Sequence, residues 1–352
     1  MARPRAMIIG AGALGLGFLA ERMSPDYDLC MVDLLSQAFL LTRIRDENGY
    51  TMNLCGSAGL EHRRVYGTFT AAHMDLPDLR TPIAGSQSVA AALEAADLVL
   101  TAVGSRALPS VVAKIAPVLN ARNRRVWLLF CENGLGIAAA HGTAFAANVT
   151  AVDTVMSRMC RFGEVGETGY APLWPGAPQH LIAEAYAAIP LDRTLCQHGP
   201  FSAAFTLVES ADFRMWKDIK LFMHNGMHAF MSYHAFLEGT KFLPDISSRI
   251  REAARRVMLQ EVVPAILHHH PRALQPAVER YGLELLERFV DPCFHDSIER
   301  GVRGVEEKLA PGERLLAGQD FISQAGIQPR GYSSTIDAAR EIVRLKGGRI
   351  TQ

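Results

Sequence analysis

Residues 6–33 decide the fold of this chain and read AMIIGAGALGLGFLAERMSPDYDLCMVD. They open with a short apolar run that is typical of a buried strand, and then pass through closely spaced glycines into a helix-like stretch. A second apolar run follows and ends at Asp33. The order of strand, glycine-rich turn, helix and strand is the βαβ unit from which doubly wound parallel sheets are built.

The glycines of this turn each have a physical task. Gly10 permits a tight turn, Gly12 lets the backbone approach a pyrophosphate, and Gly15 lets the helix pack closely on the strand. The free N–H groups and partial positive charge of the helix N-terminus then favour a bound phosphate. The segment therefore predicts dinucleotide binding, and the alternative is a glycine-rich turn that has lost its ligand.

Asp33 indicates which dinucleotide is bound. It follows the glycine turn at a distance close to the ~20 residues that separate the turn from a ribose-binding acid in such units. Its carboxylate could accept hydrogen bonds from the ribose hydroxyls and would repel a 2′-phosphate. Residues 34–37 contain no arginine that could hold such a phosphate. We therefore expect NAD as the cofactor rather than NADP.

Two more apolar runs, residues 97–101 and 124–130, have the composition of buried parallel strands. Ligands of open parallel sheets gather at the carboxyl ends of the strands. We therefore expect Val103 and Asn133 beside the cofactor, with the Asn133 amide able to donate to a substrate oxygen. The alternative for Asn133 is a turn residue in front of Gly134.

Beyond residue 200 the sequence pattern becomes helical. We predict a dinucleotide-binding domain over residues 1–200 and a helical substrate and catalytic domain over residues 201–352. The expected class is α/β, with a Rossmann-type doubly wound sheet followed by a C-terminal all-helical domain. The four stretches with helix-like apolar spacing are residues 214–239, 245–268, 277–289 and 335–346, and Pro264 is expected to kink the second.

The first of these helices carries a polar group suited to chemistry. Positions 220, 224 and 228 are spaced by four and share one face of a helix, and Asn225 lies one step round from His224. Lys220, Asn225 and His228 can therefore converge on one pocket. A lysine amine can take the proton of a hydroxyl group, an amide can stabilise the developing alkoxide, and a histidine can orient either partner. This group predicts the oxidation of an alcohol, whereas the alternative is the solvated polar face of an amphipathic helix.

Composition excludes several other classes of function. Lysine plus arginine and aspartate plus glutamate each number 36, so we expect no nucleic-acid partner and no anionic membrane surface. The apolar run near the N-terminus is shorter than the ~20 residues of a membrane span. Six cysteines without a C-x-x-C pair are too few for a disulfide framework. We expect a cytoplasmic protein, present as a monomer or homodimer.

A metal site is not expected. His224 and His228 are four residues apart, as zinc ligands on a helix can be, but no clear third ligand and no H-E-x-x-H pattern accompanies them.

Taken together, these motifs resemble the polyol-specific long-chain dehydrogenase/reductase family, and within it the mannitol-1-phosphate 5-dehydrogenases. The resemblance extends from residue 10 to residue 315, and the K-x4-N-x2-H element is its most specific part. It is carried by the glycine turn, Thr101 to Gly104, Cys131 to Asn133, Val152-Asp153 with Arg158, Lys220-Asn225-His228, Asp291-Pro292, Asp296, Arg300, Lys308, and Ala310 to Leu315.

The resemblance implies a zinc-independent, NAD-linked conversion between a polyol or polyol phosphate, like mannitol 1-phosphate, and its ketose, like fructose 6-phosphate. Lys220 would be the general acid/base, Asn133 and Asn225 would form the oxyanion hole, and His228 would complete the site. The substrate would be bound by Arg300 and Lys308, which match substrate-contacting positions of the family, and by Arg158.

The chain also departs from the family pattern. Where V-D-R-I-x-P is common, this chain has Ser157 in place of the acid and Arg161 in place of the proline. The other readings are a ketopantoate reductase-like enzyme, which shares the glycine turn and a Lys-then-Asn helix, and a non-catalytic NAD-binding regulator. Asp33 disfavours the first because that enzyme usually binds NADP, and the intact lysine and amides disfavour the second.

Overall fold

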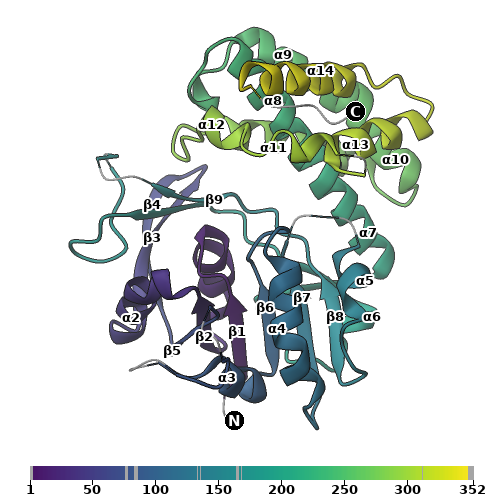
Figure 1. Cartoon of the computed structure of the whole chain (residues 1–352). Coiled ribbons are helices and arrows are strands. Elements are labelled where there is room, and N and C mark those ends of the chain that lie inside the picture. Colours follow the sequence, from purple (N-terminus) through teal and green to yellow (C-terminus); the bar gives the residue numbers. More distant parts are fainter. Residues whose placement is uncertain are drawn as a thin grey trace. The chain divides into compact units, whose positions relative to one another are not determined.

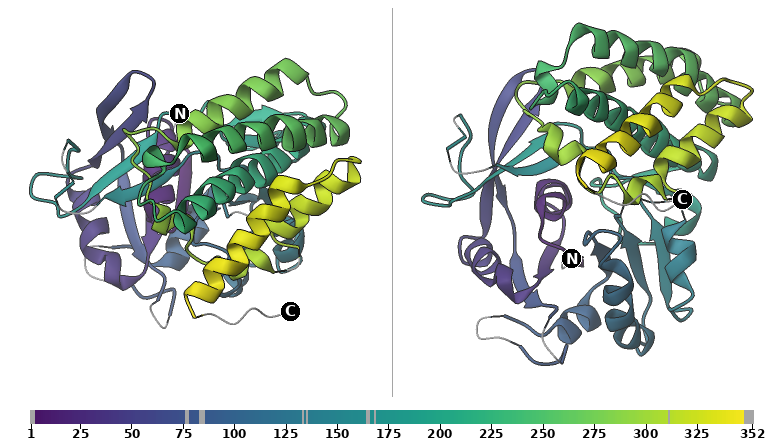
Figure 2. Two further views of the ribbon diagram at one scale, coloured as in Figure 1. Left: turned by 90° about the horizontal axis from the view of Figure 1, so that it is seen from above. Right: turned by 45° about the horizontal axis from the view of Figure 1, so that its top comes forward.

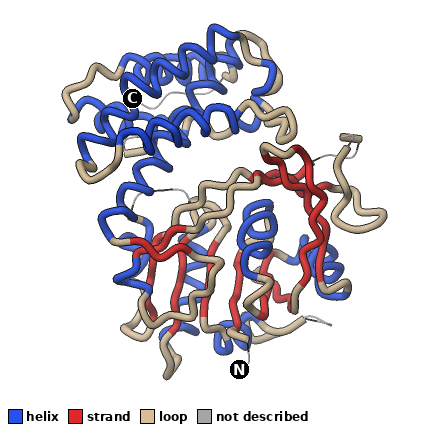
Figure 3. The backbone as a smooth tube through the Cα atoms, turned by 180° about the vertical axis from the view of Figure 1, so that it is seen from behind, coloured by secondary structure: helices blue, strands red, loops and turns tan. Residues whose placement is uncertain are grey.

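The structure is a computed structural model that describes residues 3–75, 78–82, 86–132, 134, 136–163, 166–167, 169–310 and 312–347. The chain divides into two compact units, Met1–Ser210 and Ala211–Gln352 (Figure 1). All strands among the described residues belong to the first unit, whereas the second is built from helices (Figures 2 and 3).

The first unit is built on a six-stranded sheet in which every pair of neighbouring strands is parallel. The strand order, β5-β2-β1-β6-β7-β8, is the order of the doubly wound dinucleotide-binding fold. This confirms the predicted fold class. The strands are β1 (Arg5–Ile9), β2 (Asp28–Asp33), β5 (Phe69–His73), β6 (Leu98–Thr101), β7 (Val126–Phe130) and β8 (Val149–Asp153).

The apolar strands supply two cores because successive side chains point to opposite faces of the sheet. In β1, Ala6 and Ile8 belong to one buried cluster, whereas Met7 and Ile9 belong to the other. The first cluster is covered by η1 (Gly15–Ala20), α1 (Glu21–Met23) and α2 (Ala38–Asp46), and the second by α3 (Val89–Ala95), α4 (Leu108–Asn120) and α5 (Ile137–Gly142).

A second, four-stranded sheet with the order β4-β3-β10-β9 lies against the first helix after the glycine turn. The approach is close, since a Cβ atom on Gly17 would lie 3.2 Å from the Cys160 sulfur. The sequence patterns did not predict this sheet. Its strands are β3 (Gly49–Gly56), β4 (Gly59–Tyr66), β9 (Cys160–Gly163) and β10 (His180–Glu184), and a separate pair is β11 (Pro190–Asp192) with β12 (Thr206–Val208).

The second unit contains helices over all four predicted stretches. The sequence patterns missed α13 (Arg314–Gln324), because a glycine occupies its buried face and dilutes the apolar spacing. The main helices are α7 (Ser210–Asp218), η3 (Ile219–Asn225) and α8 (Gly226–Leu237) in one continuous run, α9 (Ser248–Val257), η5 (Met258–Val262) and α10 (Val263–His269) in another, then α11 (Gln275–Phe289), α12 (Ile298–Gly301), α13 and α14 (Arg330–Leu345).

Wide π turns interrupt three of the helices, at η1, η3 and η5. The last has a simple cause. Pro264 has no N–H group, and its ring crowds the carbonyl four residues earlier. The helix accommodates it by widening, so that the Val263 N–H group donates to the Met258 carbonyl, five residues back. Among the described residues, no helix combines the length and low charge that a membrane span requires.

Candidate active site

The glycine turn of the first unit has the shape that the sequence pattern predicts. Gly10 has a φ of +106°, and a Cβ atom there would lie 2.4 Å from the Ala102 carbonyl oxygen. A Cβ atom on Gly15 would lie 1.9 Å from the Gly10 oxygen, whereas one on Gly12 would meet nothing within 4 Å. The backbone itself therefore needs the first and third glycines, and the second leaves open space above the turn, as the approach of a pyrophosphate requires.

Asp33 ends strand β2 and is tied to this turn. Its Oδ2 atom accepts a hydrogen bond from the Ala11 N–H group at 2.7 Å, and its Oδ1 atom accepts one from the Leu34 N–H group at 2.7 Å. A carboxylate has about four acceptor positions, so these two bonds fix its orientation and leave capacity for hydroxyl donors. The carboxylate therefore fits a cofactor with free ribose hydroxyls.

Glu132, for which the sequence motifs predict no role, holds two strand ends together. It follows β7, is 8% exposed, and accepts hydrogen bonds from the Thr101 hydroxyl at 2.7 Å and the Val103 N–H group at 3.0 Å. Burial raises the pKa of this carboxyl group despite those bonds. The N–H group of Val103, a predicted cofactor contact, is thus engaged by Glu132. The predicted site residue Asn133 lies outside the described residues.

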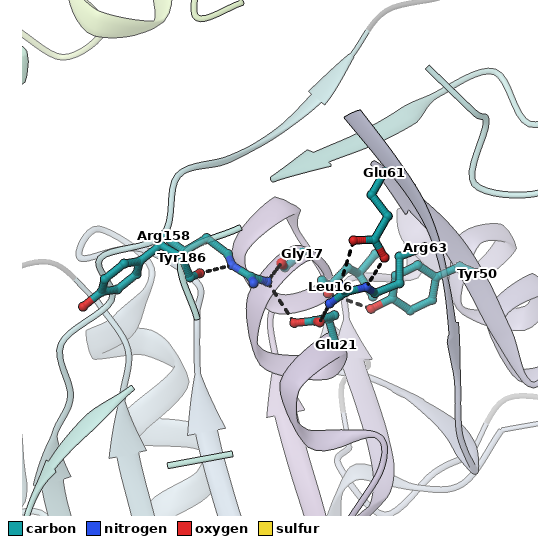
Figure 4. Close-up of polar contacts among 8 residues, drawn as sticks. All are labelled: Leu16, Gly17, Glu21, Tyr50, Glu61, Arg63, Arg158 and Tyr186. Carbon is teal, nitrogen blue, oxygen red and sulfur yellow. Dashed lines mark hydrogen bonds and ion pairs between the residues drawn. The ribbon is translucent and has the colours of Figure 1, made fainter. Parts of the chain in front are cut away.

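Arg158 lies in the interior of the first unit, with 1% of its side chain exposed (Figure 4). Its Nη1 atom donates to the Gly17 carbonyl at 2.8 Å and pairs with the Glu21 carboxylate at 2.9 Å. Its Nε atom donates to the carbonyl of Tyr186. The sequence predicted that Arg158 binds substrate, but these partners engage its guanidinium inside the protein. Its placement instead points to a structural role at the helix that follows the glycine turn.

Arg161, which departs from the family pattern, is also paired. Both of its terminal nitrogens donate to the Glu167 carboxylate, at 3.0 and 2.8 Å. Its charge is therefore balanced within its own segment.

In the second unit, Lys220, Asn225 and His228 lie on the continuous run α7–η3–α8, and all three are partly buried. The π turn η3 changes their relation. Hydrogen bonding between residues five apart brings residues of that spacing into line, which aligns Lys220 with Asn225. His228 follows three residues later on α8, along the same side. The Asn225 amide nitrogen is buried and has no acceptor among the described residues, so it can donate to an incoming oxygen.

His228 is held by a carboxylate that is remote in sequence. Its Nε2 atom lies 2.9 Å from Oδ2 of Asp296, which is fully buried. Burial is the largest influence on the pKa of His228 and lowers it, although Asp296 acts in the opposite direction. A neutral ring that donates from Nε2 to a carboxylate presents an unprotonated Nδ1 atom, which can accept a hydrogen bond.

Asp296 also binds Arg300, one of the predicted substrate residues. The Arg300 Nε atom donates to Asp296 Oδ1 at 2.6 Å, and a second guanidinium nitrogen pairs with Oδ2. Burial raises the pKa of Asp296, but the charge of Arg300 and the bond from His228 outweigh it, so the pKa is lowered overall. Asp296 therefore remains a carboxylate that orients both partners.

Lys308, the other predicted substrate cation, donates from Nζ to the Gly301 carbonyl at 2.8 Å and lies 5.8 Å from the centre of the Tyr233 ring. Burial, followed by the charges of Arg314 and Arg300, lowers its pKa to about 7. It can therefore change charge near neutral pH.

His224 belongs to the interior rather than to this polar line. Its ring meets Phe289 edge-on, with ring centres 5.2 Å apart, and it is 3% exposed. Burial and then the charge of Lys220 lower its pKa, so it is neutral. Among the described residues, no three His, Cys, Asp or Glu side chains gather in a metal-binding group.

A dinucleotide-binding sheet followed by a helical unit with a lysine, an amide and an imidazole in line defines a dehydrogenase that acts on alcohols. Family models support this class. The mannitol dehydrogenase Rossmann domain matches residues 4–157, and the mannitol dehydrogenase C-terminal domain matches residues 212–335. The chain belongs to the mannitol dehydrogenase family and is accordingly an NAD-dependent oxidoreductase that acts on the CH–OH group of a polyol.

Individual relatives agree with this assignment. Mannitol-1-phosphate 5-dehydrogenase from Halalkalibacterium halodurans is 25% identical over 344 residues, covering 95% of this chain and 87% of the relative.

Two solved structures share the fold. Pseudomonas fluorescens mannitol 2-dehydrogenase, in a ternary complex with NAD and D-mannitol, has a TM-score of 0.68 at 14% identity over 96% of this chain and 78% of that one. A ketopantoate reductase from Ralstonia eutropha has a TM-score of 0.56 at 16% identity over 97% and 99%.

Proposed function

We propose that the protein interconverts a hexitol phosphate, of the mannitol 1-phosphate type, and the corresponding ketose phosphate, with Lys220 as general acid/base. The observation that carries the proposal is the π turn η3, since it aligns an amine with an amide whose N–H donors have no acceptor among the described residues. The relative from H. halodurans, whose name specifies mannitol 1-phosphate, supports the phosphorylated form of the substrate.

Each residue of this line has a distinct task. In the direction of oxidation, the Lys220 amine accepts the hydroxyl proton of the reacting carbon, and in reduction it returns that proton. Asn225 donates to the oxygen as negative charge develops, which stabilises the transition state more than the ground state. His228, oriented by Asp296, accepts a hydrogen bond from a neighbouring hydroxyl group through Nδ1. Asn133 is proposed as a second amide donor.

The cofactor is proposed to lie over the glycine turn, its pyrophosphate above Gly12 and its ribose hydroxyls at Asp33. When bound, NAD supplies the acceptor for the hydride that leaves the alcohol carbon. Val103 is proposed to contact the cofactor with its side chain, because its N–H group is engaged by Glu132.

Arg300 and Lys308 are proposed to bind the polar chain and the phosphate of the substrate. Arg300 remains 31% exposed at its side chain although it pairs with Asp296, so part of its guanidinium can reach a ligand. Guanidinium and ammonium groups suit phosphate oxygens because they combine charge with several N–H donors. We do not include Arg158, whose guanidinium is engaged in the interior.

The test of the reaction is substrate-dependent NAD⁺ reduction, followed by absorbance, with mannitol, mannitol 1-phosphate and the matching pentitols. We expect the hexitol phosphate to be turned over with the highest kcat/KM, and fructose 6-phosphate to be reduced with NADH. Preferential reduction of ketopantoate with NADPH would instead support the ketopantoate reductase-like reading.

The test of the mechanism is the Lys220→Ala variant. It should lose turnover by roughly 10³-fold or more, since general base catalysis contributes up to ~10⁴-fold, while binding NADH as the wild type does. A variant that retains wild-type turnover would exclude Lys220 as the base. If the wild-type protein binds NADH but oxidises no polyol, the result would favour the alternative that the protein is a non-catalytic NAD-binding regulator.

A further inference from the structure

The π turn η3 is held by a side chain from another helix. In a regular α-helix the Gly226 N–H group would donate to the Phe222 carbonyl, four residues back. Here it donates to the Met223 carbonyl instead, and the hydroxyl group of Tyr332, from α14, donates to the Phe222 carbonyl. The phenol thus occupies the acceptor position that the Gly226 N–H group leaves open when, at the end of η3, it donates to the carbonyl three residues back.

The surrounding glycines make room for this ring. A Cβ atom on Gly226 would lie 1.8 Å from the Tyr332 oxygen, and a Cβ atom on Gly318 would lie 2.2 Å from the ring. Tyr332 is 2% exposed, so its ring is enclosed by the protein. Any side chain at position 226 or 318 would collide with the ring, so only glycine at both positions leaves the space that it fills. The fit is specific to a phenol that reaches the helix backbone.

The same arrangement occurs independently at the other π turn of functional importance. At the end of η1 the Glu21 N–H group donates to the Phe18 carbonyl rather than to Gly17, and Arg158 donates to the Gly17 carbonyl (Figure 4). One carbonyl earlier, the Tyr50 hydroxyl donates to Leu16 at 2.6 Å. In both units, therefore, a buried side-chain donor takes over the carbonyl that a π turn releases.

The register of η3 determines where the reacting groups lie. An α-helix turns by about 100° for each residue, so two residues five apart would lie about 140° apart around its axis. The π turn removes most of this difference and brings Lys220 and Asn225 into line. If the Phe222 carbonyl lost its donor from Tyr332, the Gly226 N–H group could bond to it, and the helix would return toward the α register.

We propose that Tyr332 is a positioning residue: its hydroxyl holds η3 in the π register and thereby keeps the Lys220 amine and the Asn225 amide on one side of the helix. The proposal rests on the proposed function, in which those two groups handle the proton and the oxygen of the reacting CH–OH group. Tyr332 itself acts only through the helix backbone.

The test is Tyr332→Phe, which keeps the ring in its slot and removes only the hydroxyl. The matched control is Tyr27→Phe in the first unit. Tyr27 is fully buried, and its hydroxyl also donates to a backbone carbonyl, that of Pro200, but not within a helix. Tyr27→Phe therefore loses the same kind of donated hydrogen bond from a buried position, together with the bond that its hydroxyl accepts from the Ser202 N–H group at 2.9 Å, which makes it the stricter control for stability.

We expect Tyr332→Phe to lower kcat by roughly 10- to 100-fold, the scale of loss when reacting groups are misplaced by about 1 Å. The pH at which kcat reaches half its plateau should also shift, because the environment of the amine changes, while the Kd for NADH stays within twofold of wild type. Tyr27→Phe should lower Tm without changing kcat or the pH profile.

The proposal is overturned if Tyr332→Phe loses Tm as Tyr27→Phe does but keeps the wild-type kcat and pH profile. That result is distinct from failure of the proposed function, which would appear as retained turnover in Lys220→Ala. If Lys220→Ala and Tyr332→Phe both remain fully active, the general base is another residue, and the register of η3 does not affect catalysis.

Discussion

At the scale of single residues, Lys308 is the clearest source of pH dependence. Its pKa falls from 10.5 to about 7 in the folded protein, with burial as the main cause. Between pH 7 and about 10.5 the unfolded chain therefore carries a proton at Lys308 that the folded chain has lost. Because the unfolded state binds more protons there, the contribution of this residue to stability rises with pH across that window.

We predict that Lys308→Met lacks this rise. The free energy of unfolding of the wild type should increase relative to the variant between pH 7 and 9, measured by urea denaturation at fixed ionic strength. Lys241→Met, at an exposed position after α8, is the control and should run parallel to the wild type, because Lys241 is not among the charges that shift the pKa of Lys308. Parallel curves for Lys308→Met as well would mean that Lys308 keeps its proton when folded.

The residues that sequence reasoning found share one property, which is short spacing. Lys220, Asn225 and His228 lie within one helical run, so their spacing indicates that they are close together, although it does not reveal the π turn that aligns the first two. Asp296 could not be found as the partner of His228 in this way, because 68 positions separate them and only the fold brings them together. Glu132 could have been suspected, since it is an acid at the end of an otherwise apolar strand.

At the scale of elements, the sequence predicts best those strands that are buried on both faces. β1, β6 and β7 read as apolar runs because both of their faces are covered, as parallel strands require. β4 is largely exposed and its composition is polar, so it carries no such pattern. The π turns were also missed, because one extra residue in a helix leaves the apolar periodicity almost unchanged.

The Arg158–Glu21 pair links the segment between β8 and β9 to the helix that follows the glycine turn, and its loss should affect that helix. Arg158→Met would leave the Glu21 carboxylate buried with Arg63 as its remaining partner and the Gly17 carbonyl without its donor. We predict a destabilisation of roughly 3 kcal/mol, as for other broken buried pairs, together with weaker NADH binding. Urea denaturation and fluorescence titration measure the two effects.

A double variant separates the pair from its parts. Arg158→Met with Glu21→Leu removes both charges and should be less destabilised than Arg158→Met alone, since no uncompensated buried charge remains. Arg344→Met breaks an exposed pair with Glu341 and should change stability little, because solvent screens such pairs. If Arg158→Met costs no more than Arg344→Met, the buried pair does not anchor the helix.

At the scale of the whole molecule, cofactor chemistry and proton chemistry are assigned to different compact units. Both buried clusters on the faces of the parallel sheet draw their members from residues before 210, so the first unit has a core of its own. The glycine turn and Asp33 lie in this unit, whereas Lys220, Asn225, His228 and Asp296 lie in the second. Binding and turnover should therefore be separable by truncation.

We predict that a fragment of residues 1–210 folds, because it contains the whole six-stranded sheet and the helices on both of its faces. It should bind NADH with a Kd within roughly tenfold of the full chain, a difference of no more than about 1.4 kcal/mol in binding free energy. It should show no polyol oxidation at all, because it lacks Lys220, the proposed general base. The full-length Lys220→Ala variant is the matched control, since it removes the same amine and keeps every other residue.

A fragment with native-like circular dichroism that fails to bind NADH would contradict this prediction. It would show that residues beyond Ser210 are needed for cofactor binding, so that binding and turnover cannot be separated at this boundary.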